Sequence, residues 1–190
     1  MRLSRGEARD LLAEWVQSES LRRHCLAVEA AMRAYARKCG EDEELWGVVG
    51  LLHDMDYERY PDLGTGHPRI ALEELPKLGY PEDVVDAVAG HATFLGIPRE
   101  TLMARALFAV DELSGFIQAC AYVRPTGIHG MAPKSVKKKL KQPSFAAGVN
   151  RDEVHEAAEE LGVEFDDHVA LLIEALEERA DELVPARDSA

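Results

Sequence analysis

The stretch VVGLLHDMDY, residues 48–57, begins as an apolar run and then places a histidine and an aspartate where the run would continue. Its apolar residues recur with a helical period, and the acidic residues at positions 41–44 suit the positive end of a helix dipole. Burying an ionisable pair such as His53 and Asp54 is costly unless a partner satisfies both groups. The stretch therefore predicts a buried helix that ends at two side chains in need of a partner.

The rest of the chain has the same helical periodicity, and no segment alternates as a strand would. Ser4 with Glu7 forms a capping-box pattern, Gly40 follows a long periodic segment, and Asn150 precedes another. The expected helices cover 8–16, 20–39, 45–54, 68–78, 81–92, 99–123, 135–141, 151–161 and 165–183. We therefore predict an all-α bundle of about eight or nine helices that forms a single domain over residues 1–190.

Composition narrows the classes of partner. The chain has 190 residues, 46% of them hydrophobic, and a formal charge of −13, which disfavours nucleic acid and anionic membranes as main partners. No apolar run approaches the roughly 20 residues of a bilayer-spanning helix, and charges interrupt the N-terminal residues as they would not in a signal peptide. The widely spaced Cys25, Cys39 and Cys120 favour reduced thiols. We expect a cytoplasmic protein, and the sequence indicates no oligomeric state.

Two further polar residues interrupt apolar faces on other helices. His24 lies in LRRHCLAV and Asp111 lies in ALFAVDELSG. Each alone could be an ordinary hydrogen-bonded residue, but one ion shared with His53 and Asp54 would satisfy all four side chains together. A mixed set of imidazoles and carboxylates suits Mn²⁺, Fe²⁺, Co²⁺, Ni²⁺ or Zn²⁺, with Mg²⁺ as a further option.

The order His24, His53-Asp54, Asp111 on a helical chain resembles the HD superfamily of metal-dependent phosphohydrolases, over residues 20–120. The segment GTGHPRIALEEL, residues 64–75, is similar to a helix start found in the HDIG and HD-GYP branches, and AVAGHATF, residues 87–94, is similar to their next segment. The whole pattern looks like the small, stand-alone bacterial HD-domain proteins. Two differences matter: the chain has HDMD where HDIG members have Ile-Gly, and no GYP motif follows, so cyclic di-GMP hydrolysis is not implied.

The resemblance implies a larger ligand set. It adds His67 and His91 as metal ligands, which would allow a second ion, with Asp54 bridging the two and acting as the catalytic residue. Each added histidine also has a structural interpretation. His67 could cap a helix beside Pro68, and His91 could be a cation at a helix C-terminus. The sequence does not decide whether the site holds one metal ion or two.

The function that the resemblance implies is hydrolysis of a phosphate ester of a small metabolite or nucleotide by a metal-activated water. Two alternatives stay open. Some HD proteins with six ligands are di-iron oxygenases, and a non-catalytic nucleotide-binding or regulatory module could keep a structural metal. Asp56, Tyr57 and Glu58 follow the His-Asp pair closely. One of them could shuttle a proton to the leaving group, or they could cap the helix and face solvent.

A basic segment, residues 124–151, contrasts with the acidic chain. Between Phe116 and Arg151 there is no Asp or Glu. Seven basic residues lie there: Arg124, Lys134, Lys137, Lys138, Lys139, Lys141 and Arg151. They could form a solvated helix packed near the acidic C-terminal helix. Alternatively, four of them could bind the substrate phosphate, and the candidates are Arg124, Lys134, Lys137 and Lys138.

Overall fold

The computed structural model describes residues 2–184, and over this range it contains helices and no strand. The α-helices are α1 (Arg5–Trp15), α2 (Glu19–Cys39), α3 (Glu43–Leu52), α4 (Arg69–Lys77), α5 (Glu82–His91), α6 (Leu102–Tyr122), α7 (Pro133–Leu140), α8 (Arg151–Leu161), α9 (Phe165–Glu177) and α10 (Ala180–Leu183). A 3₁₀ turn, η1 (Thr93–Leu95), lies between α5 and α6. The predicted all-α fold is confirmed, with ten α-helices over residues 2–184 instead of eight or nine.

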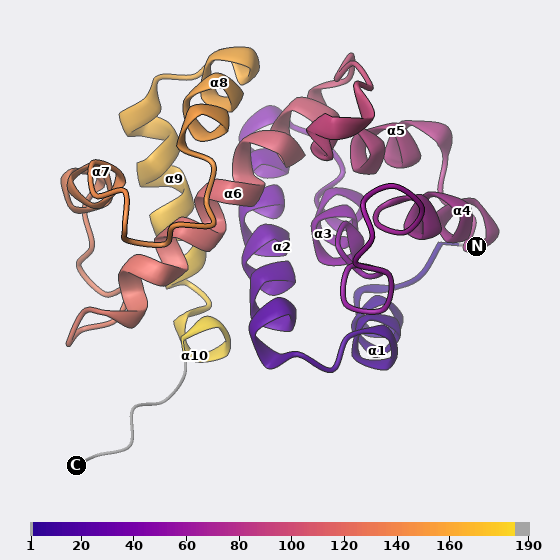
Figure 1. Cartoon of the computed structure of the whole chain (residues 1–190), viewed down its shortest axis with the longest axis horizontal. Coiled ribbons are helices and arrows are strands. Elements are labelled where there is room, and N and C mark those ends of the chain that lie inside the picture. Colours follow the sequence, from indigo (N-terminus) through magenta and orange to yellow (C-terminus); the bar gives the residue numbers. More distant parts are fainter. Residues whose placement is uncertain (1, 185–190) are drawn as a thin grey trace.

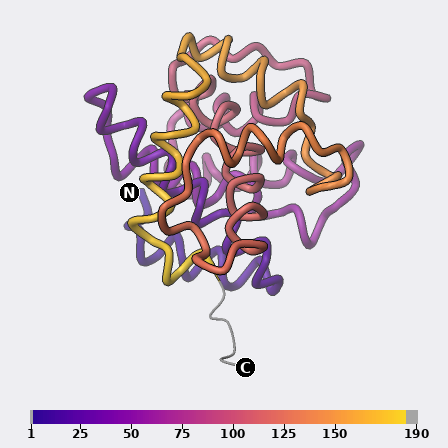
Figure 2. The backbone as a smooth tube through the Cα atoms, turned by 90° about the vertical axis from the view of Figure 1, so that its left-hand side faces the viewer, coloured from indigo at the N-terminus to yellow at the C-terminus, as the bar shows by residue number. Residues whose placement is uncertain are grey.

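The long helices α2 and α6 form the middle of the bundle. Figure 1 shows α1, α3, α4 and α5 on one side of α2, and α7, α8 and α9 on the other, while α6 crosses between the two groups. Seen from the side in Figure 2, the orange and yellow segments after α6 cover one face of the molecule. The segments that carry the predicted ligands therefore gather around α2 and α6.

The extra helix arises because the predicted segment 165–183 is broken. The helix α9 ends at Glu177 and α10 begins at Ala180, with Arg179 between them at φ −121° and ψ 23°. The guanidinium of Arg179 lies 3.6 Å from the carboxylate of Glu29 and 3.0 Å from that of Glu182. The break turns Arg179 toward the buried Glu29, a contact that helical periodicity alone does not indicate.

Glu29 ties several helices together from the middle of α2. Its side chain is fully buried, and its carboxylate accepts hydrogen bonds from Arg5 of α1 and from Arg33 one turn along α2. Arg33 also donates to the carboxylate of Glu44 in α3, 2.7 Å away. Buried charges are tolerated when they are paired in this way, and removing one partner leaves the other uncompensated.

The helix α3 approaches the backbone of α2 unusually closely at Gly50. A Cβ placed on Gly50 would lie 2.8 Å from the carbonyl oxygen of Val28, a separation that real Cβ atoms essentially never show. One turn earlier, a Cβ on Gly47 would lie 2.5 Å from the Nε of Arg33. Glycine at these two positions lets α3 lie against α2, and His53 follows Gly50 by three residues. The close packing therefore sets the position of the predicted site.

Other expectations about the chain concern membranes and cysteines. Within residues 2–184, none of the helices combines the length and the apolar character that crossing a bilayer requires. Cys25, Cys39 and Cys120 are all free thiols, with Cys25 and Cys120 buried. Burial raises the pKa of the Cys120 thiol to about 11, which keeps it protonated at neutral pH.

We predict that Gly50→Ala destabilises the protein. Alanine would ordinarily gain up to about 1 kcal/mol over glycine inside a helix, but overpacking against the α2 backbone costs about 1–3 kcal/mol. The expected net loss is about 1–2 kcal/mol in the free energy of urea unfolding. Gly148→Ala is the matched control, because a Cβ there meets nothing within 4 Å. Equal stabilities for the two variants would contradict the close packing.

Candidate metal centre

Six predicted side chains from five segments meet in one place. His24 lies in α2, His53 and Asp54 directly follow α3, His67 precedes α4, His91 is the last residue of α5, and Asp111 lies in α6. Two of them lie within long helices and the others lie at or next to helix ends, and the packing of these segments brings all six side chains into the interior. His53 is fully buried, and the side chains of Asp54 and Asp111 are 15% and 18% exposed.

The carboxylate of Asp54 lies at the centre of the group. Its Oδ2 is 3.5 Å from the Nε2 of His53 and 3.8 Å from that of His24. Its Oδ1 is 3.5 Å from the Nε2 of His67 and 3.4 Å from that of His91. Each oxygen therefore faces a different pair of imidazoles, an arrangement that could hold two cations with Asp54 between them.

Asp111 completes the Oδ2 side of the group. Its Oδ1 lies 2.9 Å from the Nε2 of His24 and 3.4 Å from that of His53. Two sets of three side chains each present ligand atoms within 4.8 Å of one another. They are His24, His53 and Asp111 in one set, and His53, Asp54 and His91 in the other. His67 belongs to neither set and joins the group through Asp54.

Hydrogen bonds at Nδ1 fix which nitrogen of each ring points inward. The Nδ1 of His53 lies 2.8 Å from the Gly50 carbonyl, and the Nδ1 of His91 lies 2.5 Å from the Val88 carbonyl. A carbonyl can only accept, so each Nδ1 carries the hydrogen, and once a ring has no proton on Nε2 it turns that lone pair toward the carboxylates. The Nε2 of His53 is buried without a hydrogen-bond partner. Orphaned buried atoms of this kind are rare and point to a missing partner.

Asp56 orients His67 and corrects our expectation for this segment. We expected a proton shuttle or a solvent-facing cap, but the Asp56 side chain is fully buried. Its Oδ1 lies 2.8 Å from the Nδ1 of His67, and its Oδ2 accepts from the backbone N–H of Ala71 at 2.8 Å. A carboxylate behind a histidine is the usual support of a metal-ligating ring. The signal in the sequence was an acidic residue two positions after Asp54, in the turn that leads to His67.

The charges of the group fit a cation. Burial alone lowers the pKa of His53, but Asp54 and Asp111 beside it raise that pKa to about 9. Although burial raises the pKa of each carboxyl, the neighbouring histidines hold both well below the usual range. Nitrogen lone pairs and carboxylate oxygens 3.4–3.5 Å apart repel one another unless positive charge lies between them. The donor set therefore fits divalent transition metals, which imidazole and carboxylate ligands favour.

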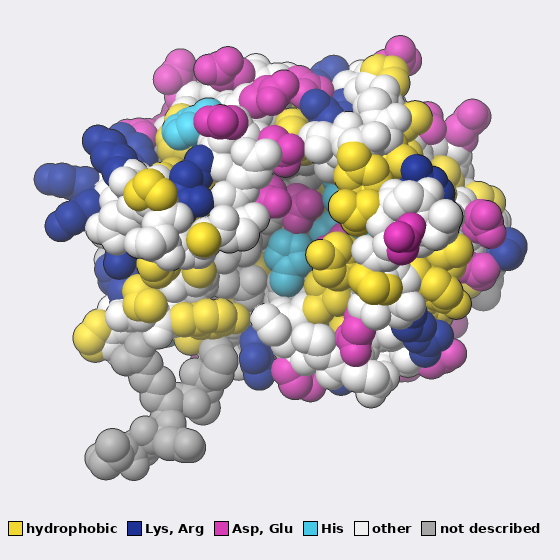
Figure 3. Space-filling view, in the orientation of Figure 1, with side chains coloured by type: hydrophobic (Ala, Val, Ile, Leu, Met, Phe, Trp, Pro, Cys, Tyr) yellow, Lys and Arg dark blue, Asp and Glu magenta, His cyan; other side chains and the backbone are white. Residues whose placement is uncertain are grey.

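All of the group except the fully buried His53 lines the floor of an open cavity of about 460 Å³. Figure 3 shows the hollow in the middle of the face, with histidine atoms on its floor, acidic side chains beside them and hydrophobic side chains along its right rim. Glu112 lies on the wall, where burial and the nearby charges of Asp111 and Glu153 raise its pKa to about 7. Sequence reasoning assigned Glu112 no role, since an acidic residue after Asp111 carries no signal of its own.

The four basic residues predicted to bind phosphate are not among the residues that line this cavity. Arg124 donates to the carbonyl oxygens of Gly127 and His129, and the Nζ of Lys137 lies 2.7 Å from the carboxylate of Asp166 in α9. In Figure 3 the basic side chains over α7 gather at the left edge, away from the hollow. The contact between Lys137 and Asp166 favours the other interpretation, a solvated helix beside the acidic C-terminal helices.

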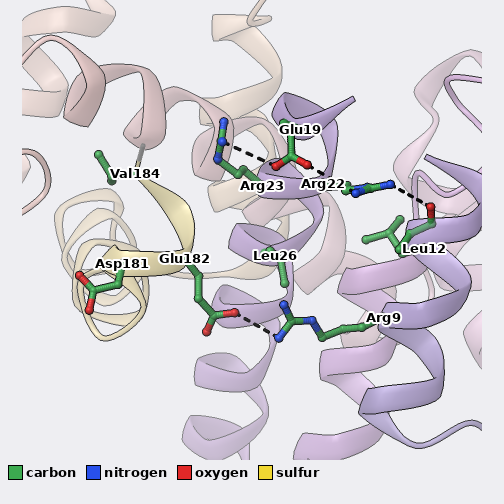
Figure 4. Close-up of a pocket in the computed structure, with 10 residues that line it drawn as sticks. Arg9, Leu12, Glu19, Arg22, Arg23, Leu26, Asp181, Glu182 and Val184 are labelled. Atoms are coloured by element: carbon green, nitrogen blue, oxygen red, sulfur yellow. Dashed lines mark hydrogen bonds and ion pairs between the residues drawn. The ribbon is translucent and has the colours of Figure 1, made fainter. Parts of the chain in front are cut away.

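A second hollow, of about 450 Å³, lies between α1, α2 and α10 and contains none of the six residues. Figure 4 shows Arg9 next to Glu182, and Arg22 and Arg23 next to Glu19. Arg9 lies 3.3 Å from the carboxylate of Glu182, and Arg22 and Arg23 both contact Glu19. Its three arginines are matched by Glu19, Asp181 and Glu182. The Arg9–Glu182 pair joins α1 to α10, while the other two pairs lie within α2, so the charges of this hollow are largely matched by one another.

The fold and this cluster define an all-α protein with a candidate metal centre. The profile of the HD domain matches residues 21–115, half of the chain, and the chain therefore belongs to the HD domain family. The predicted family is thus confirmed. Its members are generally metal-dependent phosphohydrolases, and the match ends four residues after Asp111.

A curated relative and the solved structures add little further detail. The chain is 29% identical over 98 residues to Ribonuclease Y of Oleidesulfovibrio alaskensis. The aligned part is 52% of this chain and 18% of that protein, so the chain spans less than a fifth of the relative's length. No solved structure gives a significant match.

We predict that Asp56→Asn weakens one metal site and spares the other. Loss of the carboxylate behind a ligating histidine typically costs 10–100-fold in metal affinity, about the loss expected here. The His24, His53 and Asp111 set does not contact Asp56, so calorimetric titration with Mn²⁺ should resolve one weakened and one unchanged site. Asp62→Asn, at an exposed carboxylate that holds Thr65, is the control. Equal weakening of both sites would contradict the assignment.

We also predict that metal binding releases a proton and tightens as the pH rises. In the metal-free protein the pKa of His53 is about 9, so below pH 9 a cation must displace a proton from this ring. For one displaced proton, the apparent Kd falls about tenfold per pH unit between pH 7 and 8.5 and levels off above pH 9. Calorimetry in buffers of different ionisation enthalpy counts the released protons. A Kd that does not change with pH would contradict a proton on His53 in the metal-free protein.

Proposed function

We propose that this protein is a phosphohydrolase that cleaves a phosphate ester of a small metabolite or nucleotide, and that His24, His53, Asp54, His67, His91 and Asp111 hold its divalent metal. One observation carries the proposal: three imidazoles tethered at Nδ1 turn their Nε2 atoms toward the two oxygens of Asp54 at the floor of an open cavity. Membership of the HD domain family supports the same reaction class.

The reaction needs an activated water, and the residues of the chain position the groups that would provide it. Bound cations would supply a water of lowered pKa and neutralise the charge on the phosphate. The water oxygen forms a bond to phosphorus, the ester P–O bond breaks, and a proton from the water goes to the leaving alcohol. Asp54 bridges the two halves of the site, while Asp56, Gly50 and Val88 fix the rings through their Nδ1 atoms. The buried positions of these groups keep the ligand atoms preorganised for the attack.

The curated relative agrees with phosphoester chemistry but does not specify the substrate. Its name designates a ribonuclease, which cleaves phosphodiester bonds in RNA. The present chain matches only a small part of that protein. The cavity wall of the present chain includes Glu112 and Glu153, and negative charge on a cavity wall disfavours a polyanion as substrate. We therefore propose a small phosphorylated molecule instead of RNA.

We predict that Asp54→Ala lowers kcat/KM for p-nitrophenyl phosphate by about 10³-fold or more, because it removes the bridge between both halves of the site. The measurement is turnover by protein loaded with Mn²⁺, Ni²⁺ or Co²⁺, with the helical circular dichroism signal as the test of folding. Asp86→Asn, an exposed carboxylate on α5, is the matched control and should keep full activity.

Any of three results would contradict the proposal. Full activity of a folded Asp54→Ala variant would show that the Asp54 carboxylate is not needed for the reaction. Metal-dependent melting without turnover of any phosphate ester would instead favour a structural metal in a binding module. Oxygen consumption by the iron-loaded protein would identify an oxygenase.

A further inference from the structure

The cavity wall combines apolar and acidic side chains. Three large apolar side chains line it, Tyr57, Leu63 and Phe94, which are 45%, 47% and 49% exposed. Glu112 and Glu153 also line the cavity. Among the described residues, the wall includes no Lys and no Arg. The right rim of the hollow in Figure 3 has the same apolar character.

Apolar surface continues beyond the cavity itself. Tyr57 packs edge-on against the ring of His67, a proposed ligand, with 5.0 Å between the ring centroids. A smaller hollow of about 380 Å³ shares His24 and Tyr57 with the main cavity and includes Leu21 and Pro61. Glu58 also lines it, but its carboxylate already accepts from backbone N–H groups before α2. A ligand that extends past Tyr57 would therefore meet apolar surface in both hollows.

The acidic residues leave no place for a second anionic group. Glu153 is held by the hydroxyl of Thr93, 3.1 Å from its carboxylate. The nearby Arg151 donates to the carbonyl oxygens of Leu140 and Val149, and is thereby directed into the loop before α8. A nucleoside triphosphate bound through one phosphate would carry its remaining charges in a cavity whose wall holds acidic and no basic residues. Like charges at such distances are unfavourable, because water in a cavity screens them incompletely.

We propose that the substrate is a phosphate monoester of an aromatic or similarly apolar alcohol that carries no second anionic group. Tyr57, Leu63 and Phe94 bind the leaving group, and Glu112 and Glu153 select against di- and triphosphates. This specificity rests on the proposed phosphohydrolase function and assigns the substrate class of that same site. The reaction is the hydrolysis described above, with the apolar alcohol as the leaving group.

The first test measures binding without turnover. Phenylphosphonate and methylphosphonate have the same charge and cannot be hydrolysed as esters, so calorimetry with Mn²⁺-loaded protein isolates the apolar contribution. Phenylphosphonate should bind about tenfold more tightly, as expected when half-exposed apolar side chains cover a ring. Leu63→Ala with Phe94→Ala should bring the ratio close to one and leave methylphosphonate unchanged. Val123→Ala, an apolar residue 56% exposed outside the cavity, should preserve the ratio.

The second test measures selection by charge. Wild-type protein should hydrolyse phenyl phosphate with a higher kcat/KM than ATP, and Glu153→Gln should raise kcat/KM for ATP about fivefold relative to phenyl phosphate. Glu156→Gln, exposed on the same helix and outside the cavity, should change neither value. Equal binding of the two phosphonates, or a preference for ATP, would overturn the assigned specificity while the hydrolase function stands. If neither phosphonate binds, the proposed function itself is wrong, and this specificity with it.

Discussion

The structure depends on an electrostatic requirement at Asp54. Four imidazole Nε2 atoms lie 3.4–3.8 Å from the two oxygens of this carboxylate, and Asp111 adds further negative charge beside His24 and His53. When they are neutral, the rings of His53, His67 and His91 carry their hydrogen on Nδ1 and present only Nε2 lone pairs to these oxygens, so positive charge must lie between them. A proton on His53 can supply part of it, and divalent cations supply it more fully.

The fold meets this requirement by bringing residues from five segments together. Close contact at Gly50 places α3 against α2, and the Gly50 carbonyl accepts a hydrogen bond from the Nδ1 of His53. The last turn of α5 does the same for His91 through the Val88 carbonyl. His67 differs, because it precedes α4 and is held by the carboxylate of Asp56. The scaffold thus fixes three of the four rings before any ligand binds, which is how a site gains affinity without reorganising.

Local patterns predicted much of this structure, and tertiary contacts account for what they missed. The apolar period predicted the helices, and the interruption at His53 and Asp54 predicted where the site begins, because both follow from neighbouring residues. The break at Arg179 depends on Glu29, which is 150 residues away in the sequence. The burial of Asp56 depends on His67 and on the start of α4. Likewise, the position of the lysines on α7 depends on how α7 packs against α9, which periodicity does not specify.

The most direct measurement of the central claim is anomalous X-ray scattering from crystals grown with Mn²⁺. The account predicts anomalous peaks on either side of the Asp54 carboxylate, one near His24, His53 and Asp111 and one near His67 and His91. It also predicts Mn–ligand distances close to 2.2 Å, in the range of first-row metals bound by nitrogen and oxygen. Well-ordered crystals with no anomalous density between these side chains, at Mn²⁺ concentrations that saturate binding in solution, would contradict it.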